Sequence, residues 1–304
     1  MTVFFLCLTG LVGYSLGHMS NKILVIGANG MLGCAVFRYF SRQYGFDVLG
    51  TVRSQVIQQH LGSLGLTNTV AGCGASGYSS FKNVFEDFKP DVVINCVGLI
   101  KQLPASGKAV HAVDVNALFP HRLAELSTAC GARLIHFSTD CVFSGSKGMY
   151  VESDTPDAID IYGRSKLLGE VYDAPHLTLR TSIIGHELNS NVSLIDWFLS
   201  RHGTLNGYSR AIFSGLPTIC VAKFIHQFVL NNKDLHGLYH LAAEPISKYD
   251  LLSVVRDVYG KRIEIIPDDS LVIDRSLDSA RLRQATGFIP RPWPDLVEAM
   301  HNFG

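Results

Sequence analysis

The feature that most constrains the fold is a short apolar strand followed at once by three evenly spaced glycines. Residues 22–26 form a short strand pattern that is apolar and mostly β-branched after Lys22, of the type that is buried on both faces of a parallel sheet. Gly27, Gly30 and Gly33 follow with the spacing G-x-x-G-x-x-G, and an amphipathic helical pattern continues to Phe40. The sequence therefore predicts a strand–turn–helix unit near the start of the chain.

Glycines in such a turn let the backbone approach a pyrophosphate, which the positive end of the following helix stabilises. A plain strand-to-helix turn is the alternative interpretation. The position of the glycines between a buried strand and a helix favours dinucleotide binding. We expect cofactor contacts from the six loop residues Gly27, Asn29, Gly30, Met31, Leu32 and Gly33.

Short apolar strands alternate with amphipathic helices along the rest of the chain, and this alternation is typical of a doubly wound parallel sheet. We predict an α/β fold with a Rossmann domain over residues 19–182, to which a return segment at about 218–243 contributes. Residues 183–304 are predicted to form mainly a smaller C-terminal α/β substrate-binding domain.

Residues 1–18 are treated separately. The stretch from Val3 to Leu16 is apolar but too short for a confident membrane span, and no basic region precedes it. We interpret residues 1–18 as a non-native leader, with a membrane anchor as the less favoured alternative.

Charge and cysteine usage narrow the class of protein. The net charge is zero and basic runs are absent, so neither nucleic acid nor an anionic membrane is an expected partner. Seven dispersed cysteines without metal-ligand spacing predict reduced thiols in the cytoplasm and no metal site.

The end of the second predicted strand indicates which cofactor is used. Residues 46–51 form that strand, and Arg53 and Ser54 follow where NAD-binding proteins usually carry an Asp or Glu. A cation suits a ribose 2′-phosphate, so we favour NADP(H), with NAD(H) as the alternative. A solvated loop arginine is the structural alternative for Arg53.

Two further segments are expected near the cofactor. The buried strand at 91–96 leads into Cys96, Val97 and Gly98, which we expect to pass beneath the cofactor. Asn116 lies in a helical pattern over 109–130, where it could hydrogen-bond the backbone near the site or simply face solvent.

The candidate catalytic residues follow the strand at 133–137. Ser138, Thr139 and Asp140 come directly after it, where side chains point into the ligand crevice of an open α/β sheet. Tyr162 and Lys166 are spaced to lie on one face of a helix, and a neighbouring cation favours the phenolate of tyrosine. This pair predicts a general acid or base for a carbonyl/alcohol substrate.

These motifs together resemble the extended short-chain dehydrogenases/reductases, and most of all the dTDP-4-dehydrorhamnose reductase branch. The resemblance rests on the glycine motif, on S-T-D-x-V-F-x-G from Ser138 and on Y-G-R-S-K-x-x-G-E from Tyr162 to Glu170. It implies hydride transfer from NAD(P)H to the C4 ketone of a nucleotide-linked 4-keto-6-deoxy sugar, for surface-polysaccharide precursors.

The resemblance also implies residue roles. Tyr162 protonates the new alkoxide and contacts the cofactor, Lys166 lowers the pKa of Tyr162 and binds the nicotinamide ribose, and Thr139 hydrogen-bonds the substrate carbonyl. The remaining residues that we place at the substrate are Lys101, Ser138, Asp140 and Phe213.

The chain departs from the family pattern at three places. Cys141 stands where this branch commonly has tyrosine, residues 71–74 lack an expected acidic residue, and residues 99–104 replace the usual loop near the sugar. The identity of the nucleotide and the sugar therefore stays open.

Two alternatives remain, an epimerase or dehydratase of the same fold and a non-catalytic NADP-binding regulatory subunit. The oligomeric state is also open, with a homodimer as one option.

Overall fold

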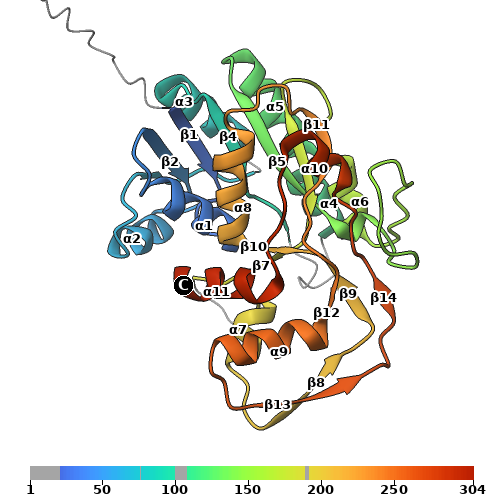
Figure 1. Ribbon diagram of the computed structural model, residues 1–304. Coiled ribbons are helices and arrows are strands. Elements are labelled where there is room, and N and C mark those ends of the chain that lie inside the picture. The colour runs from blue at the N-terminus through green and yellow to red at the C-terminus, as the bar shows by residue number, and fades with distance from the viewer. Residues whose placement is uncertain (1–20, 76, 100–107, 189–191) are drawn as a thin grey trace, which may run out of the picture.

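The apolar runs of the chain become parallel strands of one sheet. The computed structural model describes residues 21–75, 77–99, 108–188 and 192–304. A seven-stranded sheet has the order β11-β6-β5-β4-β1-β2-β3, and each neighbouring pair is parallel (Figure 1). Its strands are β1 (Asn21–Ile26), β2 (Phe46–Thr51), β3 (Thr69–Val70), β4 (Val92–Asn95), β5 (Arg133–Thr139), β6 (Leu177–Thr181) and β11 (Gly237–His240). The predicted Rossmann-type α/β fold is confirmed.

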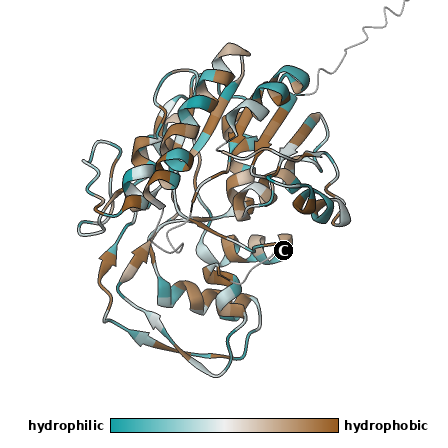
Figure 2. Cartoon of the chain, turned by 180° about the vertical axis from the view of Figure 1, so that it is seen from behind, coloured by the Kyte–Doolittle hydropathy of each residue, from teal (hydrophilic) through white to brown (hydrophobic). Residues whose placement is uncertain are grey.

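Side chains of β1 alternate between two hydrophobic clusters, one on each face of the sheet. Ile23 and Val25 belong to a cluster that includes α1 (Met31–Phe40) and α8 (Thr218–Phe224). Leu24 and Ile26 belong to the other, with α3 (Tyr78–Phe88) and α5 (Phe119–Ala129). Figure 2 shows the apolar character of these central strands. Burial on both faces is the reason that the strands read as continuous apolar runs.

The long helical pattern around Asn116 is one helix with an irregular middle. It consists of α4 (Lys108–Ala112), the π-helical segment η1 (Val113–Leu118) and α5. A second π-helical segment, η3 (Ile225–Val229), continues α8. The first of these helices lies close to the predicted helical range 109–130.

One helix was not predicted from the sequence. The region from Gln55 to Ser80 shows little periodicity, yet α2 (Gln55–Ser63) forms there and β3 follows it. Of the α2 residues only Leu61 is buried, so the helix has almost no apolar stripe to detect. Its N-terminus is stabilised by Ser54, whose Oγ accepts a hydrogen bond from the backbone N–H of Ile57 at 3.4 Å.

The chain after β5 alternates between the two parts of the molecule. The 3₁₀ turn η2 (Asp140–Val142) and α6 (Ile161–Leu168) follow β5 directly. The smaller lobe in the lower half of Figure 1 contains short strands and two helices. These are β7 (Ile183–Ile184), α7 (Leu194–Leu199), β8 (Thr204–Tyr208), β9 (Ala211–Phe213), β10 (Leu216–Pro217), β12 (Ile246–Ser247), α9 (Lys248–Val258), β13 (Glu264–Asp268) and β14 (Ile273–Asp274).

The last two helices, α10 (Ala280–Thr286) and α11 (Trp293–Phe303), end the chain. The segment 218–243 contains α8, η3 and β11, and β11 pairs with β6 in the large sheet.

The strand order places a ligand crevice at one edge of the sheet. From β1 the chain moves outward to β2 and β3 and then returns to the other side of β1 as β4. Such a reversal opens a crevice at the carboxyl ends of the two central strands. The glycine loop after β1 and the segment 96–98 after β4 therefore meet there.

Residues 1–18 and Lys101 lie outside the described residues. Within the described ranges, no helix has the length and apolar character needed to cross a membrane.

Candidate active site

A cavity of about 510 Å³ opens at the carboxyl edge of the sheet. Its wall on the large sheet comes from the start of α1, the ends of β4 and β5 and from α6. Its other wall comes from residues within 181–187 and 192–194. The predicted site residues that line it are Gly30, Met31, Leu32, Cys96, Val97, Gly98, Ser138, Thr139, Asp140, Tyr162 and Lys166.

The glycine loop is shaped by close backbone contacts. Gly27 has φ +81°, a conformation that L-residues rarely adopt, and a Cβ there would lie 2.7 Å from Val97 Cγ2. A Cβ at Gly33 would lie 2.0 Å from the carbonyl oxygen of Gly27. By contrast, the nearest atom to a Cβ at Gly30 is 3.6 Å away. Gly27 and Gly33 are therefore required by the backbone conformation of the loop. Gly30 is not, and its missing side chain leaves space beside the cavity.

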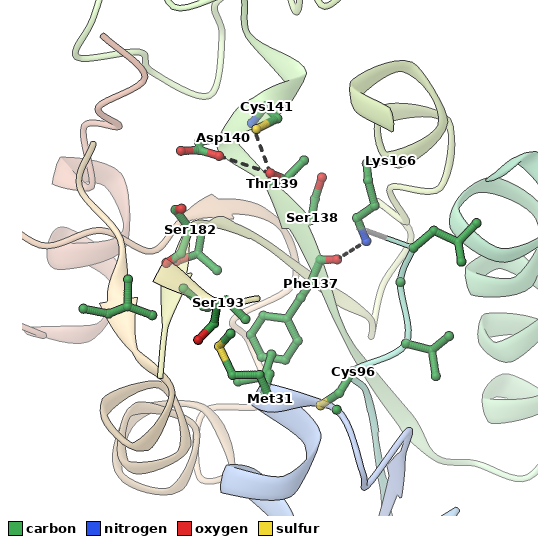
Figure 3. Close-up of a pocket in the computed structure, with 18 of the residues that line it drawn as sticks. Met31, Cys96, Phe137, Ser138, Thr139, Asp140, Cys141, Lys166, Ser182 and Ser193 are labelled. Atoms are coloured by element: carbon green, nitrogen blue, oxygen red, sulfur yellow. Dashed lines mark hydrogen bonds between the residues drawn. The ribbon is translucent and has the colours of Figure 1, made fainter. Parts of the chain in front are cut away.

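The N-terminus of α1 has no side-chain cap, since Gly30 occupies the N-cap position. Its first residues, Met31 and Leu32, line the cavity, and Figure 3 shows Met31. Uncapped N–H groups and the positive helix end suit a pyrophosphate at this position. Asn29 is half-buried in the same loop but does not line the cavity.

Asn116 holds the segment after β4 against α6. It is fully buried, its Oδ1 accepts a hydrogen bond from Leu99 N at 2.8 Å, and its Nδ2 donates to Ser165 Oγ at 3.1 Å. Of the two sequence interpretations, the structure therefore shows the hydrogen bond to the backbone near the site. The π-helical segment η1 carries this residue.

Thr139 stands at the centre of a small hydrogen-bonded group. Its Oγ1 donates to Asp140 Oδ1 at 3.1 Å and accepts from the backbone N–H of Cys141 at 3.1 Å (Figure 3). Its side chain also hydrogen-bonds the Tyr162 hydroxyl, which lowers the pKa of that phenol. The strand end and the helix α6 thus bring the two predicted proton-handling groups together.

Tyr162 is protonated at neutral pH in the free protein. Burial raises its pKa above the usual value, and the charge of Cys141 acts in the same direction. The Lys166 ammonium is not one of the main influences on the pKa of Tyr162. The reason is where the ammonium points, because Lys166 Nζ donates to the carbonyl oxygen of Phe137 at 2.6 Å (Figure 3).

Lys166 is itself strongly affected by its surroundings. Burial lowers the pKa of the Lys166 ammonium to about 8, and the charge of Glu170 acts in the opposite direction. A Cβ at Gly98 would lie 3.7 Å from Lys166 Nζ, so the ammonium is close to the segment that follows β4.

Three of the predicted site residues have a side-chain partner or a position that differs from direct contact with the cavity. Ser138 lines the cavity, but its hydroxyl donates to Glu170 Oε1 at 2.6 Å. Phe213 is 3% exposed and does not line the cavity, because its ring packs against Trp293 and under the Lys248 ammonium. Arg53 is exposed after β2 and lies outside the cavity lining.

The opposite wall of the cavity was not predicted from the sequence. In Figure 3, Ser182 and Ser193 lie on the other side of the β5 end from Lys166. Ser182 belongs to the segment 181–187 and Ser193 to the segment 192–194, and Ile183 and Glu187 line the same wall. The loosened pattern after Thr181 was the available signal, since ligand contacts concentrate on irregular segments.

Lys248 from the smaller lobe faces the Asp140 side of the cavity. Its Nζ lies 3.5 Å from the centroid of the Phe213 ring, and burial lowers its pKa to about 8. Burial raises the pKa of Asp140, while the charges of Lys248 and Arg275 lower it. Charged groups of both lobes therefore act on the carboxylate at this end of the cavity.

A comparison with protein families finds one model that spans nearly the whole described chain. The model described as "RmlD substrate binding domain" matches residues 21–302. The match includes the glycine loop, the Thr139–Tyr162–Lys166 group and the smaller lobe.

Two curated relatives carry different names. A dTDP-4-dehydrorhamnose reductase of Aggregatibacter actinomycetemcomitans is 25% identical over 297 residues, covering 90% of this chain and 95% of the relative. The methionine adenosyltransferase 2 subunit beta of Xenopus laevis is 25% identical over 293 residues, covering 90% of this chain and 79% of the relative.

Among solved structures, a dTDP-4-dehydrorhamnose reductase from Bacillus anthracis in complex with NADP has the same fold, with a TM-score of 0.76. It is 20% identical, and the match covers 93% of this chain and 99% of that one.

Proposed function

Because the chain belongs to the RmlD substrate binding domain family, we propose that it is an NADPH-dependent reductase of a nucleotide-linked 4-keto-6-deoxy sugar. The reaction would transfer a hydride to the C4 ketone, in the formation of surface-polysaccharide precursors. The observation that carries the proposal is the group of Thr139, Tyr162 and Lys166 on one wall of the 510 Å³ cavity.

The cradle at the carboxyl edge of the sheet fits a dinucleotide. The open space at Gly30 and the uncapped start of α1 suit the pyrophosphate, and residues 96–98 form the floor towards Lys166. The dinucleotide, when bound, supplies the hydride. Lys166 would hold the nicotinamide ribose through its ammonium, which is the dominant form at neutral pH because its pKa is about 8.

The NADP preference rests on Arg53. This residue is exposed just after β2, at the strand end where the adenosine ribose of a bound dinucleotide is expected. A guanidinium there can bind a 2′-phosphate through charge-assisted hydrogen bonds. Ser54 is already used as the cap of α2, so Arg53 carries the phosphate contact in this proposal.

Tyr162 is the proposed proton donor. Its raised pKa keeps the hydroxyl protonated at neutral pH, which is the form that a general acid requires. Thr139 hydrogen-bonds this hydroxyl and lies at the same wall, so it can donate to the ketone oxygen beside it once its own proton turns away from Asp140. Tyr162 would then transfer its proton to the oxygen that becomes the alkoxide.

The sugar would occupy the space between the two walls of the cavity. Asp140 and Ser138 face it from the end of β5, and Ser182 faces it from the smaller lobe. The hydroxyl oxygen of Ser138 still has acceptor capacity for a sugar hydroxyl while it donates to Glu170. Lys101 is part of this proposal from the sequence alone.

A second candidate function is a dinucleotide-binding subunit of another enzyme. The observation that favours it is the similarity to a methionine adenosyltransferase 2 subunit beta over 90% of this chain. The assembled Thr139–Tyr162–Lys166 group favours the reductase, because a binding subunit has no chemical need for a proton donor beside a hydroxyl and an ammonium.

The two functions are separated by an assay of NADPH oxidation with a panel of dTDP-, UDP- and GDP-linked 4-keto sugars. The reductase consumes NADPH with at least one of them and forms the corresponding alcohol. NADPH binding without oxidation across the whole panel would favour the subunit.

A further inference from the structure

Glu170, the last residue of the Y-G-R-S-K-x-x-G-E motif, is a buried carboxylate just behind the proposed site. It is 2% exposed and follows α6 by two residues. Arg180 of β6 holds both of its oxygens, with Nε to Oε1 at 2.7 Å and Nη2 to Oε2 at 2.8 Å. A buried pair of this kind is weak evidence for stability alone, because apolar replacements are often equally stable. Stability alone therefore does not explain why Glu170 and Arg180 are buried at this position.

Ser138 connects this carboxylate to the catalytic strand end. Its Oγ donates to Glu170 Oε1 at 2.6 Å. On either side of Ser138, Phe137 accepts the hydrogen bond of Lys166 Nζ at 2.6 Å, and Thr139 carries the hydroxyl next to Tyr162. The segment 162–170 and the end of β5 are thus joined twice, by Lys166 to Phe137 and by Glu170 to Ser138.

The other oxygen of the Glu170 carboxylate, Oε2, has hydrogen-bond partners of its own. Tyr172 donates its hydroxyl hydrogen to Glu170 Oε2 at 2.6 Å. Arg180 Nη1 faces His240 Nε2 at 3.4 Å, and His240 Nδ1 donates to the Tyr150 carbonyl at 3.0 Å. Burial lowers the pKa of His240, which keeps that ring neutral. The Glu170–Arg180 ion pair thus lies at the centre of the network, and its carboxylate is the group bonded to Ser138.

We infer that Glu170 is a positioning residue for the proposed reduction, which fixes the Phe137–Thr139 strand end through Ser138 and supplies the negative charge behind Lys166. The inference rests on the proposed function. Burial lowers the pKa of Lys166 to about 8, and Glu170 raises it, so the carboxylate opposes loss of the ammonium proton.

Among the residues that the structure describes, the other groups around Lys166 do not provide such a charge. His136 of β5 is fully buried and its pKa lies well below the usual value, so it is neutral. Tyr162 on the same helix is protonated, and Gly98 and Asn116 beside the ammonium do not titrate. Arg180 lies behind Glu170 and is paired with it.

The chain offers a matched pair of variants to test the positioning role. Ser138→Ala removes the hydrogen bond to Glu170 on the side of the strand end, while Tyr172→Phe removes one on the other side. We expect Ser138→Ala to lower kcat roughly ten- to a hundredfold, because small misplacements of catalytic groups have effects of that order. NADPH affinity should stay parental in both variants, and Tyr172→Phe should also keep the parental kcat.

Glu170→Gln tests the charge. Removal of the negative charge lowers the pKa of Lys166, so the pH above which kcat/KM and NADPH affinity fall should move down by about one unit or more. Both quantities are measured from about pH 6 to pH 10, a range that includes the pKa of Lys166. If the carboxylate has only a structural role, Glu170→Gln should lower the melting temperature and leave the pH at which kcat/KM and NADPH affinity fall unchanged.

The outcomes separate the inference from the proposed function. The inference is overturned if Ser138→Ala keeps the parental kcat. It is also overturned if a folded Glu170→Gln loses kcat/KM and NADPH affinity at the same pH as the parent. If Glu170→Gln does not fold, the comparison of Ser138→Ala with Tyr172→Phe decides. A parental protein that binds NADPH but reduces none of the sugars refutes the proposed function only, and the pH dependence of NADPH affinity in Glu170→Gln then decides the inference.

Discussion

The dinucleotide loop makes a sharp prediction because its glycines differ in what surrounds them. Gly33 and Gly62 both lie within helices, α1 and α2, so alanine should improve helix propensity at either one by about 0.5–1 kcal/mol. A Cβ at Gly62 meets nothing within 4 Å, whereas one at Gly33 lies 2.0 Å from the Gly27 carbonyl oxygen. The two substitutions therefore differ in one contact.

The contact at Gly33 is with backbone, which cannot rotate away. Overpacking costs about 1–3 kcal/mol, and a clash this close belongs at the upper end of that range. After subtraction of a helix gain of about 1 kcal/mol, Gly33→Ala should lower the free energy of unfolding by about 2 kcal/mol. It should also weaken NADPH, because the loop around Gly27 must shift.

Gly30→Ala separates the fold of the loop from its ligand. The nearest atom to the new Cβ is 3.6 Å away, so stability should change by no more than about 1 kcal/mol, the worth of a poorer N-cap. NADPH affinity should nevertheless fall, because the methyl group occupies the space proposed for the pyrophosphate.

The assay is denaturant unfolding together with NADPH titration by fluorescence for the three variants. Gly62→Ala should be more stable than the parent with unchanged affinity. Parental affinity in Gly30→Ala would refute the proposed position of the pyrophosphate, and parental stability in Gly33→Ala would refute the steric argument.

The remaining predictions concern cofactor choice, the loop after β4 and pH. Arg53→Ala should weaken NADP(H) far more than NAD(H), since a charge-assisted phosphate contact contributes about 1.5–3 kcal/mol; equal losses would remove Arg53 from the phosphate site. Asn116→Ala leaves Leu99 N without its acceptor and should lower the free energy of unfolding by about 1–3 kcal/mol, measured by denaturant unfolding. NADPH affinity should decrease as pH rises through about 8, where Lys166 loses its proton, and this step should be absent in Lys166→Met. Deletion of residues 1–18 should leave the melting temperature unchanged, and loss of folding would show that they belong to the core.

The fold was predictable because its strongest signals are local. A strand buried on both faces and three glycines in register specify the first βα unit without any long-range information. Helix α9 also begins at a local signal, since Ser247 caps it by accepting a hydrogen bond from Asp250 N at 3.0 Å. Helix α2 and strands such as β7 and β10 escaped prediction because they are short or bury too little to leave a period.

The candidate site was predictable on one wall only. Thr139, Tyr162 and Lys166 come from neighbouring elements of a recognisable motif, and the structure brings them to one cavity. The other wall comes from residues across the cavity, where the loosened pattern after Thr181 signals an irregular stretch but does not single out Ser182 or Ser193.

Phe213 shows the opposite case, a predicted substrate residue whose ring has other neighbours. An aromatic residue at the start of a loop looks available to a ligand, but its ring is taken up by Trp293 and Lys248. The direction of the Lys166 side chain could not be predicted from the sequence either. Its bond to the Phe137 carbonyl depends on how α6 lies against β5.

The central claim is that Tyr162 donates the proton in a carbonyl reduction, and the Tyr162→Phe variant tests it most directly. The substitution keeps the buried ring and removes only the hydroxyl. We predict a folded protein with parental NADPH affinity whose turnover of a 4-keto nucleotide sugar falls roughly a hundred- to ten-thousandfold, the usual contribution of general acid catalysis. Turnover close to the parental rate in Tyr162→Phe would contradict the account.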